Sequence, residues 1–62
     1  MKLRYIVEGK FSATFTATQN VSSVADANKK VISLKLINQM EGYMKHSGFT
    51  LYDNNNVVIK KY

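Results

Sequence analysis

The first eighteen residues alternate between apolar and polar positions. The even positions are polar apart from Ile6, and the odd positions hold the apolar side chains Leu3, Tyr5, Val7, Phe11, Ala13, Phe15 and Ala17. Alternation of period two predicts a sheet with one buried face and one solvent-exposed face. We expect a hairpin whose connection is Glu8-Gly9-Lys10, with Val7 opposite Phe11. A single strand bent at Gly9 has the same parity, but it would far exceed the usual strand length of about five or six residues.

The central stretch predicts a helix from Ser23 to His46. Ser23 followed by Asp26 is a start signal, because the hydroxyl accepts from a free N–H of the first turn and the acid faces the positive dipole end. Lys45 and His46 in the last turn, followed by Gly48, are typical of a helix end. Such a helix would be roughly 35 Å long at 1.5 Å per residue. It would overhang strands of six or seven residues, which reach about 20–23 Å.

The predicted helix has two apolar stripes. The first, which we expect to cover the apolar face of the hairpin, contains Val24, Ala27, Val31 and Leu34. The second lies well around the helix and contains Ile32, Leu36, Met40 and Tyr43. One small sheet covers one face, so the second stripe predicts self-association, unless the helix breaks near Ser33. A third interpretation makes residues 31–37 (VISLKLI) a strand, since apolar residues alternate there.

The last fourteen residues predict two more strands, 49–52 and 57–61, around a turn cluster at 53–56. A loop of Asp53-Asn54-Asn55 would set Leu51 opposite Val57 and Phe49 opposite Ile59. Alternatively, residues 45–47 begin a further strand that turns at Ser47-Gly48. The expected fold is α+β in two layers, an antiparallel sheet in ββαββ order packed on one long helix, as a single domain of residues 1–62.

Composition limits how such a domain is stabilised. A chain of 62 residues buries a small core and usually needs a disulfide, a metal or a partner subunit. It has no cysteine and one histidine, so self-association is the most available source of extra burial. Lys2, Arg4 and Glu8 interrupt any signal-peptide pattern, and no stretch approaches a membrane span. These features predict a cytoplasmic protein without membrane association.

Charge adds a second class of partner. Nine Lys and Arg residues face four acids, and the net charge of +5 favours anionic partners such as nucleic acid. The polar face of the predicted hairpin has candidate anion contacts at Lys2, Arg4 and Lys10, with serine and threonine hydroxyls beside them. The cations are nevertheless spread along the chain, and threonine is a good strand former. An ordinary solvated face is therefore the favoured interpretation from sequence.

No pattern in the chain indicates catalysis. Each of the four acids falls in a turn, at a helix start or on a helix surface, and the three glycines are isolated. His46 in a last helical turn is typical of a dipole partner. We expect no catalytic residue, cofactor or metal. The leading hypothesis is a small homodimeric interaction module that binds another protein as a regulator or inhibitor; the alternative is a basic nucleic-acid-binding protein.

Overall fold

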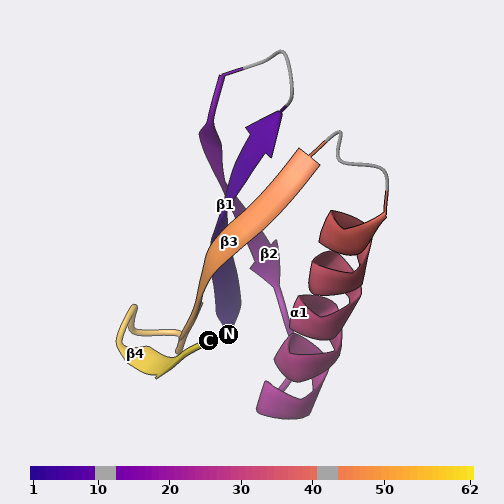
Figure 1. Cartoon of the computed structure of the whole chain (residues 1–62). Helices are drawn as coiled ribbons and strands as arrows, with labels where there is room; N and C mark the ends of the chain where they lie inside the picture. Colours follow the sequence, from indigo (N-terminus) through magenta and orange to yellow (C-terminus); the bar gives the residue numbers. More distant parts are fainter. Residues whose placement is uncertain (10–12, 41–43) are drawn as a thin grey trace.

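The computed structural model describes residues 1–9, 13–40 and 44–62, and these form a mixed α+β fold (Figure 1). Four strands make one antiparallel sheet, and a helix packs on one of its faces. The elements are β1 (Lys2–Gly9), β2 (Phe15–Asn20), α1 (Val24–Gln39), β3 (Met44–Tyr52) and β4 (Val58–Lys61). The sheet order is β2-β1-β3-β4, which makes β2 and β4 the edge strands.

The predicted alternation is confirmed in β1, where Leu3, Tyr5 and Val7 are buried and the even positions are exposed. The predicted hairpin register is wrong, because Val7 pairs with Phe15 and not with Phe11. Relative to the prediction, the residue that pairs with Val7 is displaced by four positions. Because four is an even number, every side chain still points to its expected face of the sheet. Parity alone therefore could not distinguish the two registers. Residues 10–12 of the expected connection lie outside the described residues.

The start of α1 is as predicted. Ser23 is the N-cap, and its hydroxyl accepts from the Asp26 N–H at 3.1 Å, while the Asp26 carboxylate accepts from the Ser22 N–H at 3.1 Å. The helix continues through Ser33, which excludes both the break there and the strand at 31–37. In the part of the chain that is described, no helix combines the length and the apolar character needed to cross a membrane.

The predicted end of the helix is wrong. The helix ends at Gln39, not at His46, and β3 begins at Met44. The alternative of a strand beginning at residues 45–47 is thus right in its start, but the expected turn at Ser47-Gly48 is wrong, because β3 continues to Tyr52. Its sixteen residues span about 24 Å, whereas the nine residues of β3 span about 30 Å. The helix does not overhang the sheet, so a mismatch in length between helix and strands does not support a dimer. The physical reason is long-range: β3 pairs along β1 from Lys2 to Gly9 and satisfies its backbone groups.

A bulge in β3 sets which of its side chains face the helix. Arg4 pairs with Thr50 and Ile6 with Ser47, so Gly48 and Phe49 together oppose Tyr5. Gly48 has φ +63°, the left-handed conformation typical of the first position of such a bulge. Sequence predicted this conformation for Gly48 as a helix terminator, but it lies within the strand. Because of the extra residue, His46 before the bulge and Phe49 after it both point to the buried side.

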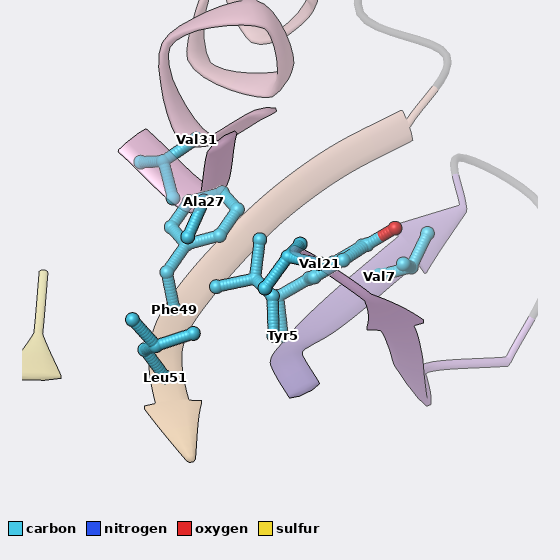
Figure 2. Close-up of a cluster of buried hydrophobic side chains, with 8 residues drawn as sticks. Tyr5, Val7, Val21, Ala27, Val31, Phe49 and Leu51 are labelled. Carbon is cyan, nitrogen blue, oxygen red and sulfur yellow. The ribbon is translucent and has the colours of Figure 1, made fainter. Parts of the chain in front are cut away.

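The core lies between α1 and the middle of the sheet. Figure 2 shows the Phe49 side chain extending from β3 towards Ala27 and Val31 of α1. The partly buried side chain of Leu34 packs against the same cluster. The first predicted stripe therefore faces the sheet, although Val24 at its N-terminal end is 37% exposed. The buried apolar residues are Leu3, Tyr5, Val7, Val21, Ala27, Val31, Phe49 and Leu51.

The turn cluster after β3 is confirmed. One carboxylate oxygen of Asp53 accepts from the N–H groups of Asn55 at 2.8 Å and Val57 at 2.9 Å. Asn56 adopts a positive φ of 62°, which asparagine tolerates better than most residues. Because the hydrogen bonds extend to Val57, the turn is longer than the predicted three-residue loop.

The longer turn changes the register of β4. Leu51 pairs with Lys60, not with Val57, and the predicted apolar face of this hairpin does not form. All four residues of β4 are exposed, including Val58 and Ile59. The last strand therefore lies beyond the area that the helix covers.

Candidate functional site

The outward side of α1 carries exposed apolar side chains. Ile32 is 60% exposed, Leu36 55% and Met40 72%, and these three residues are called the outer stripe below. Leu36 follows the buried Ala27 by nine residues, which is about half a turn around a helix of 3.6 residues per turn. The outer stripe therefore points away from the sheet. Sequence placed Tyr43 in the same group, but Tyr43 lies outside the described residues.

The neighbours of the outer stripe define its limits. Lys29, which is exposed and precedes Leu36 by seven residues, lies at its N-terminal end. Ile37 is 46% exposed and lies on the flank of α1 that faces away from Ile32. Three of the four predicted self-association residues are thus exposed: Ile32 and Leu36 form an i, i+4 pair on the outward side of α1, and Met40 is the C-cap residue directly after the helix, with an extended backbone.

The other face of the sheet, which α1 does not cover, is called the open face. Its middle row crosses all four strands, because Arg4 pairs with Thr18 and Thr50, and Thr50 pairs with Lys61. Directly paired residues of an antiparallel sheet lie on the same face. The guanidinium carbon of Arg4 lies 4.9 Å from the centre of the Tyr52 ring, which places both on this face.

The open face gathers positive charge from three strands. Lys2 and Arg4 come from β1, Lys45 pairs with Glu8, and Lys61 completes the middle row. Among the described residues of the four strands, four cations thus share the face with one acid. Of the predicted anion contacts, Lys2 and Arg4 are brought together, whereas Lys10 is not among the described residues.

Sequence reasoning missed Lys45 and Lys61. Lys45 was expected in the last turn of the helix, and it faces outward only because the bulge at Gly48 reverses the alternation of β3. Lys61 reaches the face through the register of β4, which the longer Asp53 turn decides. In the sequence, Gly48 is the one local signal of the bulge. The asparagine run is the one local signal of the register of β4.

A buried polar contact that sequence did not predict ties α1 to β3. The Asn38 amide donates to the carbonyl oxygen of His46 at 2.7 Å, and its oxygen accepts from the His46 backbone N–H at 2.8 Å. The same oxygen lies 2.9 Å from the ring Nδ1 of His46. Because an amide oxygen only accepts, this contact places a proton on Nδ1. The expected role of His46 at a helix terminus is therefore wrong.

The network continues across the core. The His46 ring lies beside Tyr5, with centroids 5.8 Å apart, and the Tyr5 hydroxyl accepts from the Gln19 side chain at 2.7 Å. Among the described residues, no buried side-chain nitrogen or oxygen lacks a partner. The network thus joins β2, β1, β3 and α1 through satisfied polar groups.

The three acidic residues that the structure describes have local structural partners. Asp26 caps α1, Asp53 organises the turn, and Glu8 lies opposite Lys45. In residues 1–9, 13–40 and 44–62, no three His, Cys, Asp or Glu side chains converge in a way that could hold a metal ion.

Two shallow hollows flank the helix. One, of about 280 Å³, is lined by Gln19, Lys29, Lys30, Ser33 and Leu34. The other, of about 300 Å³, is lined by Asn28, Val31, Ile32, Lys35, Lys60 and Tyr62. Among the described residues, neither lining includes a carboxylate or an imidazole. Comparisons with protein-family models, curated proteins and solved structures found no match for this chain.

Proposed function

We propose that the protein is a small non-enzymatic interaction module that forms a homodimer through the outer stripe. The observation that carries this proposal is the exposure of Ile32, Leu36 and Met40, each of which is more than half accessible to solvent. Contiguous exposed apolar surface is uncommon on soluble monomers and usually marks an interface. The core is small, with eight buried apolar residues among those described, so further burial is a substantial gain.

Ile32 and Leu36 have the spacing of a helix–helix contact. Side chains at i and i+4 belong to the rows that interdigitate in the commonest helix packing class, at a crossing angle of about −50°, and Met40 extends the apolar surface past the helix end. In a two-fold dimer the same patch meets itself. With Leu36 at the axis, Ile32 of one copy would meet Met40 of the other, and Lys29 would lie at the rim. No like charges would then meet at the centre.

Burial supplies the driving force. Transferring a leucine-sized side chain from water to a packed interface contributes about 1.5–3 kcal/mol when burial is complete. These side chains are already partly covered, so each contributes roughly half of that range. Six such side chains per dimer offset a considerable part of the entropy that association costs.

A protein partner has a separate place to bind. The edge strand β2 (FTATQN) has no charged residue, whereas the other edge strand, β4, has Lys60 and Lys61. Lysine on an edge discourages further strand pairing, and its absence leaves the backbone groups of β2 open to an extended segment. We propose that the dimer acts as a regulator or inhibitor by pairing with such a segment.

The non-enzymatic part of the proposal rests on the roles of the polar groups. Asp26 and Asp53 accept hydrogen bonds from backbone groups at a helix start and in a turn, and His46 bonds to Asn38. General acid–base catalysis needs such a group within reach of a substrate.

The test of the dimer is solution mass by light scattering. The native chain should have twice the monomer mass at micromolar concentration, and Leu36→Asp should be monomeric because it places a charge at the centre of the interface. Asn55→Asp adds a negative charge at an exposed position in the turn after β3, away from α1, and should remain dimeric. A native chain that is folded and monomeric at that concentration would exclude the dimer.

A further inference from the structure

We propose that the open face binds single-stranded nucleic acid. This inference is independent of the dimer, because the outer stripe lies on the helix at the opposite side of the sheet. It rests on two observations: the gathering of cations on one face and the stacking of Arg4 on Tyr52.

The cations are spaced to follow a phosphate backbone. Lys2 and Arg4 alternate along β1, and Lys61 lies in the same cross-strand row as Arg4, two strands away. Neighbouring strands are about 4.8 Å apart, so Arg4 and Lys61 start about 10 Å from each other. Lysine and arginine side chains reach several ångströms from the backbone, so each can reach a different phosphate of one strand.

Neutral donors lie between the cations. Thr18 and Thr50 flank Arg4 in the middle row, and Ser47 pairs with Ile6 in the next. Hydroxyl groups contact phosphate and sugar oxygens and fix the position of the strand on the protein. The face therefore combines attraction with positioning, and Glu8 is its one acid among the described residues of the four strands.

The Arg4–Tyr52 pair supplies a stacking platform. Arg4 is exposed and lies over the half-buried Tyr52 ring, so the guanidinium plane that faces solvent is available to a base. Unpaired bases stack on arginine planes and on aromatic rings. Ile6, 40% exposed on the same face, adds apolar contact area for a second base.

The shape of the face favours a single strand over a duplex. Reading a major groove requires an element that inserts into it, such as a helix or a two-stranded ribbon. Here α1 packs on the opposite side of the sheet, and the four strands present their side chains in one layer. A flexible single strand can lie along such a layer with its bases turned to the protein.

The first experiment is a salt titration of labelled oligo(dT) binding, followed by fluorescence anisotropy. With four cations engaged, the logarithm of the affinity should fall with the logarithm of salt concentration with a slope of about −3, since each phosphate contact on a single strand contributes about −0.7. The variant Lys2→Gln/Arg4→Gln/Lys61→Gln should reduce the slope by about 2. All three side chains are exposed, so the variant should fold.

The matched control removes the same charge from the helix. Lys29→Gln/Lys30→Gln/Lys35→Gln has the same net charge as the first variant but keeps the open face intact, so its slope should equal that of the native chain. Equal loss in both triple variants would show that binding follows net charge and would overturn the site. Absence of binding at low salt would overturn it as well.

A second variant tests base recognition. Tyr52→Leu should weaken oligo(dT) binding about five-fold or more without changing the salt slope, because stacking is lost while the charges remain. Polyglutamate, an anion without bases, should compete less well than unlabelled oligo(dT) of equal charge, and so should duplex DNA. Equal competition by polyglutamate or preference for duplex would overturn the proposal. Monomeric Leu36→Asp should bind like the native chain, so failure of the dimer and failure of this site are distinguishable.

Discussion

At the scale of single residues, the side chain of Asn38 joins α1 to β3 through three contacts with His46. Its amide satisfies both backbone groups of His46 and contacts the imidazole Nδ1. Asn38 lies in the last turn of α1, and asparagine is a weaker helix former than alanine or leucine. Here that cost is offset by holding the start of β3 against α1, where the chain has just changed direction.

We predict that Asn38→Ala destabilises the protein by about 2–3 kcal/mol, because buried backbone groups of His46 lose their partners. In a domain of this size the midpoint of thermal unfolding should fall by about 10 °C or more. Gln39→Ala, an exposed change in the same turn, should change stability by less than about 0.5 kcal/mol. Equal midpoints for Asn38→Ala and the native chain would show that the contact contributes little.

At the scale of elements, the bulge in β3 decides which side chains face the core and which face solvent. Before Gly48 the even-numbered His46 is buried, and after it the odd-numbered Phe49 and Leu51 are buried. The same reversal places Lys45 on the open face. One residue in a left-handed conformation thus links the core to the proposed nucleic-acid surface.

We predict that Gly48→Ala costs about 1–2 kcal/mol, because an L-residue with a Cβ is strained at φ +63°. The added Cβ would lie 3.4 Å from Cδ1 of Ile6, an ordinary contact, so the cost comes from the backbone. Gly48→Asn should cost less, since asparagine tolerates this conformation. Chemical denaturation measures both, and a larger loss for asparagine than for alanine would contradict the backbone explanation.

At the scale of the whole molecule, a small core coexists with much exposed apolar surface. Besides the outer stripe, Phe15 is 53% exposed at the start of β2, and Val57, Val58 and Ile59 are exposed around β4. Sequence reasoning expected Phe15 to point inward, but the helix packs mainly on β3 and does not cover that part of the sheet. The monomer alone therefore leaves apolar residues from several elements in water.

We predict that thermal stability depends on protein concentration. If only the folded dimer buries the outer stripe, mass action raises the unfolding midpoint with concentration, by about a few degrees for each tenfold increase. Leu36→Asp should have a lower midpoint that does not vary with concentration. Calorimetry over two decades of concentration provides the measurement; a constant midpoint in the native chain would oppose a stability-linked dimer.

The sequence by itself determined the features that depend on near neighbours. The alternation of β1, the Ser23 cap, the turn at Asp53 and the separation of the two helical stripes all follow from local periodicity or local hydrogen bonds. These signals act between residues that are close in the sequence, so they can be inferred without knowing the fold. The mixed α+β class and the antiparallel sheet followed from the same patterns.

Only the tertiary structure decided where the helix ends, both hairpin registers and the position of the bulge. A helix continued to His46 and a strand from Met44 are both compatible with the local pattern, and pairing with β1 favours the strand. That choice, with the bulge at Gly48, moved Lys45 to the open face and His46 into the core, while the register of β4 brought Lys61 into line with Arg4. Pairing with β1, which is distant in the sequence, decides the placements of Lys45 and His46, and the length of the turn at Asp53 decides that of Lys61.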